Sequence, residues 1–319
     1  MPVWKGIMQQ MENLVFSLNA TVPVFLMMVL GLLFKKIGFI GEELADQMNK
    51  FVFLVPLPGL VFNDLATVDF EEVWNMKFVL FCFGATVISI AISTAISFLW
   101  KDKSIQGEFI QSSYRSSAAL LGIAFIQNIY GTTGMAPLMI IGSVPLYNMM
   151  AVLVLSLFRP GQKGLDGHVV KRTLIGIIKN PIIIGIVAGL IWSALRIPMP
   201  HIMEKTVDSV AGVATPMGLM AMGATFDIRK AFAKVKPAVT AALIKLVGFV
   251  AIFLPLAAQM GFRQEELVAI LVMLGSATTV SCFVMARNMG HTSVIMLTTL
   301  FSAFTLTGWL YVMKSLSLI

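Results

Sequence analysis

The stretch QSSYRSSAALLGIAF, residues 111–125, places Arg115 between hydroxyl residues and a long apolar run. A guanidinium group binds a carboxylate through two parallel hydrogen bonds, and Ser116 and Ser117 add hydroxyl groups beside it. If this segment crosses a bilayer, its arginine either marks an ion or substrate pathway or reaches back to the membrane surface. The first interpretation predicts a binding site for an anion, and the second predicts an inert side chain.

A second polar cluster occupies GSATTVSCFVMARN, residues 275–288, and a shift of 159 positions lays Ser117 over Ser276. Small and hydroxyl residues are typical of helix-packing faces in membranes, but they also satisfy carbonyl groups that an unwound turn sets free. Two such clusters at matching positions favour an unwound crossing. The predicted binding residues are Arg115, Ser116, Ser117, Asn128, Ser276, Thr278, Thr279 and Ser281.

Three further charged residues fall inside apolar segments or at their ends. Asp208, in EKTVDSVAG, is the stronger candidate for carrying a coupling proton, since a carboxyl group within a membrane can bind and release one. Asp64, in VFNDLA, is the second coupling candidate, although a helix end facing water is the simpler interpretation. Lys245, in AALIKLVGF, has aliphatic neighbours, so we expect its amine to reach back to the membrane surface.

The elements that must position these residues are membrane helices. Hydrophobic residues make up 58% of the chain and charged residues only 12%, and apolar segments of about twenty residues recur along it. These segments lack the alternation of a membrane barrel, which predicts an all-α integral membrane protein. The net charge of +7 fits loops that face anionic lipid, and no basic soluble face is left for a nucleic acid.

Hydropathy and helix breakers predict ten spans with short loops between them. The spans cover residues 14–34, 47–66, 76–100, 108–130, 135–157, 173–196, 201–225, 237–260, 265–289 and 291–316. The longest loop, residues 159–172, is rich in glycine and basic residues, and it is predicted to be a cytoplasmic linker between residues 1–158 and residues 173–319.

The two halves resemble each other, because a shift of 158 positions lays GLLFKKIGFI over GLIWSALRIP and Pro58 over Pro216. Each half holds five spans, an odd number, so the second half must lie inverted in the membrane. Secondary transporters are built in this way, with the substrate bound near the midplane at discontinuous helices. The sequence therefore predicts two inverted five-helix repeats in which helices 4 and 9 are broken and cross.

Lysine and arginine gather in the loops after the odd-numbered spans, as in KK at 35–36 and the basic residues of 159–172. Cytoplasmic loops carry this excess, which predicts that both termini lie on the outer side of the cell inner (plasma) membrane.

Segments along nearly the whole chain resemble the auxin efflux carrier family and, more distantly, the bile acid:sodium symporters. They include MNKFVFLVPLPGLVFNDLA, GSVPLYNMMAVLVL, IKNPIIIGIVAGLIWSALRIPMP, TPMGLMAMGATF and FVMARNMGHTSVIMLTTLFSAFTLTGWL. The resemblance implies a scaffold part and a transport part, a substrate site where spans four and nine cross, and transport of organic anions such as auxin-like acids, malate or malonate. Family members usually carry prolines near both breaks. Here Ser117 and Ala277 stand there, so Gly122, Gly275 and the hydroxyls are expected to form the crossing.

No enzyme, cofactor or metal site is predicted. The three histidines lie in loops or at span edges, and Cys82 and Cys282 lie apart from each other in apolar segments without ligand spacing. The leading hypothesis is a secondary transporter of a small organic anion, with a proton or sodium as coupling ion and homodimer formation left open. A channel-like facilitator and a non-transporting membrane sensor with the same fold are the alternatives.

Overall fold

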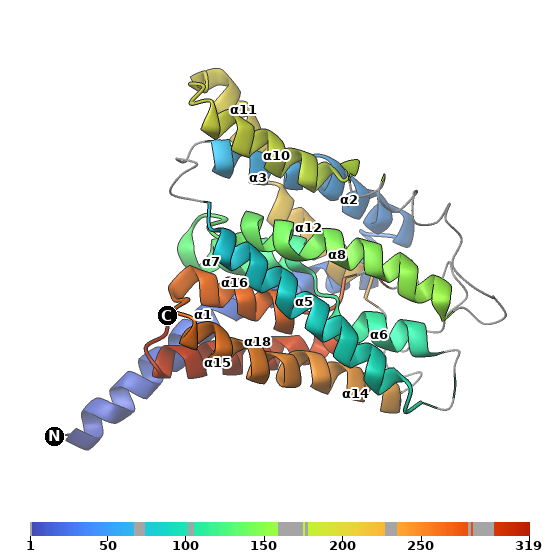
Figure 1. Ribbon diagram of the computed structural model, residues 1–319. Helices are drawn as coiled ribbons and strands as arrows, with labels where there is room; N and C mark the ends of the chain where they lie inside the picture. The colour runs from blue at the N-terminus through green and yellow to red at the C-terminus, as the bar shows by residue number, and fades with distance from the viewer. Residues whose placement is uncertain are drawn as a thin grey trace.

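The computed structural model describes residues 2–66, 74–100, 102, 105–158, 175, 178–226, 235–279, 282 and 297–319, and the regular structure of this part is helical (Figure 1). Four helical stretches in it are long and apolar enough to cross a bilayer: Met8–Lys36, Met76–Ser97, Ala136–Leu155 and Val235–Gln259. The predicted all-α membrane class is confirmed at this level. The predicted linker, residues 159–172, lies outside the described residues.

Each of the ten predicted spans contains at least part of one helix, and several are divided into shorter pieces. The elements of the first half are α1 (Pro2–Lys36), α2 (Glu42–Leu54), α3 (Pro56–Ala66), α5 (Met76–Ser97), α6 (Gln106–Tyr114), the π-helical turn η2 (Ala118–Gly122), α7 (Ile123–Tyr130) and α8 (Ala136–Leu157). Those of the second half are α10 (Pro181–Ala194), α11 (His201–Ala211), α12 (Ala214–Ala224), α14 (Val235–Leu243), the π-helical turn η3 (Ile244–Phe249), α15 (Val250–Gln259), α16 (Gln264–Gly275) and α18 (Leu297–Ser315).

Breaks in spans two and seven add to those predicted in spans four and nine. Span two is divided at Val55, whose φ of −127° and ψ of −68° are not helical. The next residue is Pro56, and a proline disfavours helical geometry in the residue before it. Span seven is divided into α11 and α12 by a turn at Gly212 and Val213, although both residues keep helical angles. Val55 and Val213 are 158 positions apart, which is the shift that relates the two halves of the sequence.

Glycines bring two helix pairs into backbone contact. α1 packs on α12, where a Cβ atom on Gly31 would collide with the carbonyl group of Met220, and one on Gly223 would collide with that of Met28. α10 packs on α3 in the same way, because a Cβ atom on Gly189 would meet the backbone of Phe62. Small residues allow this close approach between helices in membranes. Figure 1 shows α2, α3, α10 and α11 together at one edge of the molecule.

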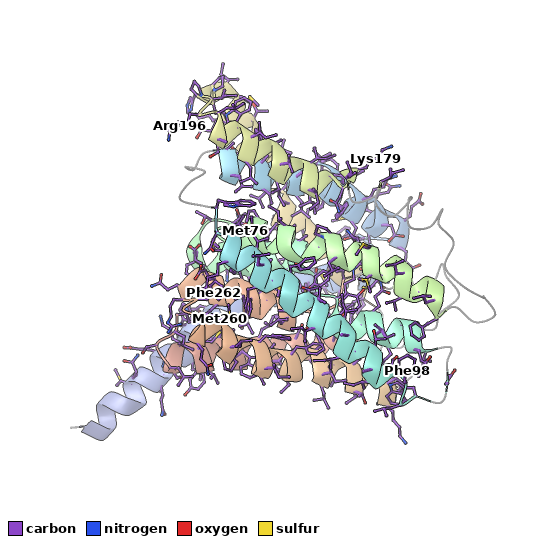
Figure 2. The ribbon with its side chains drawn as sticks, viewed as in Figure 1. Met76, Phe98, Lys179, Arg196, Met260 and Phe262 are labelled. Carbon is purple, nitrogen blue, oxygen red and sulfur yellow. The ribbon has the colours of Figure 1, made fainter. Side chains whose placement is uncertain are left out.

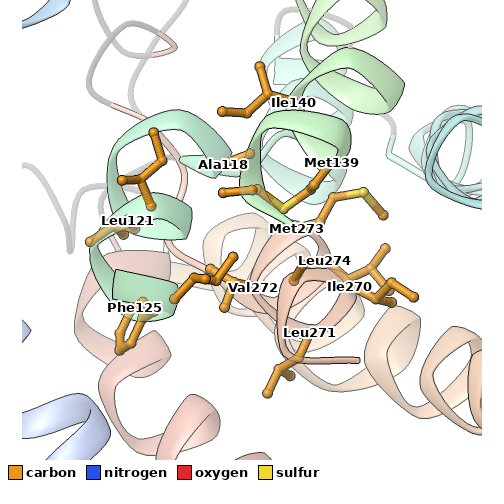
Figure 3. Packing of buried hydrophobic residues seen from close by; sticks show 14 of the residues in the cluster. Ala118, Leu121, Phe125, Met139, Ile140, Ile270, Leu271, Val272, Met273 and Leu274 are labelled. Carbon is orange, nitrogen blue, oxygen red and sulfur yellow. The ribbon is translucent and has the colours of Figure 1, made fainter. Parts of the chain in front are cut away.

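The remaining helices surround the broken ones. α5 packs against α6 and α8, while α16 packs against α15 and α18. In the core, η2 packs against α8 and α16, and α7 also packs against α16 (Figure 3). Long apolar side chains of α1, α5 and α10 are exposed instead, which suits contact with lipid (Figure 2). The helices α6 and α16 on either side of the predicted crossing are therefore enclosed by protein.

Candidate functional site

The break in span four begins where α6 ends at Tyr114. Every residue of α6 is buried. Arg115 has the extended angles φ −81° and ψ 121°, and a π-helical turn precedes α7. The hydroxyls of Ser112 and Ser113 donate to the carbonyls of Glu108 and Phe109 in the preceding turn, at 2.7 and 2.8 Å, a pattern that often bends helices. The sequence thus unwinds this helix without proline, as expected.

Span nine breaks beside it. α16 ends at Gly275, and Ser276 is extended, with φ −79° and ψ 163°. The backbone N–H of Ser117 donates to the carbonyl of Ala277 at 2.8 Å, so a hydrogen bond of the backbone joins the two unwound segments directly. The hydroxyl of Ser116 donates to the carbonyl of Leu274 at 3.3 Å. The segments that follow α6 and α16 therefore meet, and we call this meeting point the crossing.

Neighbouring helices hold the end of α16 and the segment after it. A helix leaves its last carbonyls without helical partners, and here the hydroxyl of Tyr147 on α8 donates to the carbonyl of Met273 at 3.0 Å. Thr298 of α18 accepts from the N–H of Thr278 at 3.2 Å and donates to its hydroxyl at 3.1 Å. The hydroxyl of Thr278 also donates to the carbonyl of Ser112 at 3.3 Å. Helices of both halves therefore fix the crossing.

Among the described residues three charged side chains are buried: Glu108, Arg115 and Lys245. Arg115 lies in the break of span four, and Lys245 contacts it there. Arg115 is 5% exposed, and its Nη2 donates to Oδ1 of Asn148 on α8 at 2.8 Å. This burial contradicts the alternative in which Arg115 reaches back to the membrane surface. Its guanidinium is held inside the protein, beside the crossing.

The prediction that Lys245 reaches the membrane surface is wrong. Its side chain is fully buried, and Nζ donates to the carbonyl of Arg115 at 2.6 Å and to the hydroxyl of Ser116 at 2.7 Å. Lys245 lies in the π-helical turn η3, and such turns change the direction in which a helix presents its side chains. The aliphatic neighbours in the sequence gave no sign of this inward direction.

Two hydroxyls near the break have unused hydrogen-bonding capacity. Within the described part of the chain, Oγ of Ser276 and the hydroxyl of Tyr114 are buried without a hydrogen-bond partner. Buried polar groups usually have partners, so such groups call for a water molecule or a ligand. Both residues are next to, or part of, the unwound segments, so this region has donors and acceptors to offer a bound molecule.

Other predicted site residues lie elsewhere. Asn128, on α7, is exposed and donates from Nδ2 to the carbonyls of Asn19 and Ala20 on α1, both at 2.9 Å, so it ties α7 to α1. Thr279 accepts from the N–H of Cys282 at 3.0 Å through its carbonyl, and Ser281 lies outside the described residues. These contacts do not bring Asn128 to the crossing.

The two coupling candidates also stand apart from the hydrogen bonds of the crossing. Asp208 is exposed on α11, a helix that packs on α3. Asp64 belongs to α3, and its side chain lies outside the described part of the structure.

Sequence reasoning missed Asn148, Tyr147 and Thr298 as parts of this region. The available signal was polarity, since Tyr147 and Asn148 are adjacent in the apolar segment GSVPLYNMMAVLVL. Thr298 stands in a segment with several hydroxyl residues, TTLFSAFTLT, and nothing in that pattern singles it out.

The sequence is similar to a family of membrane proteins and to two proteins that are named as transporters. Residues 16–310 match the model of the family described as "Membrane transport protein". A protein of Rhizobium meliloti (strain 1021) named "Putative malonate transporter" is 25% identical over 317 residues, which cover 92% of this chain and 94% of that protein. An "Uncharacterized transporter" of Methanothermobacter thermautotrophicus is 21% identical over 221 residues, covering 67% of this chain and 69% of the relative. The chain therefore belongs to the membrane transport protein family, in agreement with its resemblance to the auxin efflux carriers.

Proposed function

We propose that this transporter moves small organic anions across the plasma membrane by alternating access and that it binds them at the crossing of spans four and nine. The observation that carries this proposal is the pair of buried cations there, Arg115 and Lys245. Among the described residues these two cations outnumber the one buried carboxylate, Glu108 of α6. A buried excess of positive charge favours an anion.

A carboxylate is the anion that fits this chemistry. The planar guanidinium of Arg115 presents donors in a fork that matches two carboxylate oxygens, and the hydroxyls of Tyr114 and Ser276 can donate to others. The relative named for malonate supports a short dicarboxylate as the first substrate to test. Malate and auxin-like acids are the other carboxylates that we propose as substrates.

For the architecture we propose two inverted five-helix repeats, residues 1–158 and residues 173–319, joined by a cytoplasmic linker at 159–172. Repeat-related contacts support it. Gly31 approaches Met220, and Gly189 approaches Phe62, and both members of the second pair are 158 positions from their counterparts in the first. The boundary between α2 and α3 at Val55 and the boundary between α11 and α12 at Val213 are also 158 positions apart, which supports the same symmetry.

Uptake into proteoliposomes tests the function. Purified protein should take up labelled malonate in a saturable manner, and an imposed proton gradient should drive accumulation above the external concentration. Flux without saturation or accumulation would favour a channel-like facilitator. Anion binding without flux would favour a membrane sensor. Liposomes containing the Arg196→Ala protein provide a control, because Arg196 is an exposed arginine at the end of α10, away from the crossing (Figure 2).

Proton coupling through Asp208 is a separate prediction. The Asp208→Asn protein should bind malonate normally while its uptake no longer responds to a pH gradient, because asparagine keeps the size of the side chain and removes the titratable group. Asp46→Asn is the matched control, since Asp46 is an exposed carboxylate on α2. An unchanged pH response of the Asp208→Asn protein would remove Asp208, and the same comparison can then be made for Asp64.

The proposed orientation predicts which positions a membrane-impermeant thiol reagent reaches in intact cells. A cysteine introduced in the linker, residues 159–172, should be shielded, and one introduced next to Ile319 should be labelled. Background labelling should be low because Cys82 and Cys282 are both buried. Nδ2 of Asn13 donates to Oγ of Ser315 at 3.2 Å, a contact near both chain ends that supports termini on one side. The reverse labelling pattern would invert the proposed topology.

A further inference from the structure

Lys245 occupies a special position relative to the half-helix α6. Its ammonium group contacts two oxygens, the carbonyl oxygen of Arg115 at 2.6 Å and the hydroxyl oxygen of Ser116 at 2.7 Å. Arg115 directly follows the last residue of α6, so its carbonyl lies at the negative end of the dipole of that helix. The ammonium is fully buried beside this helix end.

Carbonyl and hydroxyl oxygens at the end of a half-helix are also ligands for sodium. Hard cations bind to oxygen ligands, and in many transporters unwound carbonyls and half-helix ends hold the coupling sodium ion. An ammonium group carries the same charge, and it donates hydrogen bonds to such oxygens without accepting any. Nζ of Lys245 lies 2.6 Å from one of these oxygens and 2.7 Å from the other, and both are of the kind that bind a cation.

We propose that Lys245 is a resident cation of the crossing, whose ammonium takes the place that a sodium ion would occupy, so that anion binding requires no sodium. The proposal rests on the anion site described above and deepens it by excluding sodium as the coupling ion. It also explains why a lysine is buried at this position: the charge stabilises the unwound segment of span four and adds to the attraction for a carboxylate.

The cation test uses purified protein without any anion substrate, so its result does not depend on the proposed substrate. The thermal stability of the wild type should be the same in sodium chloride and in choline chloride. The Lys245→Ala protein should be less stable in choline chloride and should regain stability in sodium chloride or methylammonium chloride, because either cation can enter the vacated space. The Lys236→Ala protein is the matched control, since Lys236 is an exposed lysine on the adjoining helix α14.

Malonate binding provides a second measurement. Loss of charge-assisted hydrogen bonds at the crossing should weaken binding by the Lys245→Ala protein about ten-fold or more in choline chloride, with partial recovery in sodium or methylammonium. The Lys245→Met protein keeps a long side chain without the charge, and neither cation should restore its binding. If no protein binds malonate, the function proposed above fails while the cation test still decides the role of Lys245.

Three results would overturn the proposal. They are a sodium requirement of the wild type, a Lys245→Ala protein that equals the wild type in choline chloride, and a Lys245→Ala protein that is weakened but responds to neither cation. The last result would make Lys245 a structural tether only. If neither Lys245 variant folds, the sodium independence of the wild type carries the test alone, and a sodium requirement there would contradict the inference.

Discussion

The Arg115→Ala protein is expected to fold and to bind malonate about 10- to 150-fold more weakly than the wild type. The range corresponds to the roughly 1.5–3 kcal/mol that a hydrogen bond to a charged group contributes. Arg115 is 5% exposed and lies in the unwound segment itself, where we propose that the anion binds. Calorimetry or scintillation proximity measures the affinity, and gel filtration checks folding.

Conservative variants separate charge from geometry at this position. Arg115→Lys keeps the charge and loses the planar fork, so its affinity should fall between those of the wild type and Arg115→Ala. Asn148→Ala removes the acceptor that holds Nη2 of Arg115 at 2.8 Å, and a smaller loss is expected because the guanidinium remains but is less well oriented. The effects of Arg115→Ala and Asn148→Ala should not add, since the two residues are in contact.

The Arg196→Ala protein is the control for loss of an exposed arginine, and it is expected to keep the wild-type affinity for malonate. A folded Arg115→Ala protein with unchanged affinity would contradict a role for Arg115 in anion binding. The site would then have to consist of the hydroxyls and Lys245.

The sequence predicted that the polar segments of spans four and nine meet, because two kinds of signal can be recognised along the chain itself. Hydropathy locates apolar segments, and clusters of serine, threonine and glycine in matching positions of two repeats point to unwound backbone. The contact between Ser117 and Ala277 has this origin. Gly275 ends α16 as expected, and Gly122 lies in a π-helical turn just after the break in span four. Neither position needed a proline.

Side-chain direction could not be predicted in the same way. Lys245 and Asp208 are similarly deep in their predicted spans, yet Lys245 is fully buried and Asp208 is exposed on α11. Depth along a span does not specify which face of the helix meets protein, and the π-helical turn at Lys245 changes that face again. Asn128 shows the same limit, because its amide contacts the backbone of α1 and not the crossing. To predict these side-chain directions, one must know which helices pack against each face of the helix.

Substitution of Gly31 should have the largest effect on stability. The backbone of α1 touches that of α12 here, so a Cβ atom at Gly31 would collide with the carbonyl group of Met220, which is not the end of a flexible side chain. Overpacking usually costs about 1–3 kcal/mol, and a collision with backbone should reach at least the upper end of that range. We expect Gly31→Ala to lower the melting temperature in detergent and Gly31→Leu to prevent recovery of folded protein.

Gly84 provides the matched control because it is also a glycine inside a long membrane helix, and a Cβ atom there would meet nothing within 4 Å. Alanine has the higher helix propensity by about 1 kcal/mol, so Gly84→Ala should leave the melting temperature unchanged or raise it.

Gly223→Ala should behave like Gly31→Ala, since a Cβ atom at Gly223 would collide with the carbonyl group of Met28 across the same interface. Because both glycines bring α1 and α12 together, the double variant should lose less than the sum of the two single losses: once the helices have moved apart for one Cβ atom, there is room for the other. Equal melting temperatures for Gly31→Ala and Gly84→Ala would mean that α1 and α12 do not approach at backbone distance in the folded protein, and the repeat-related contact of Gly189 with Phe62 would then lose its counterpart.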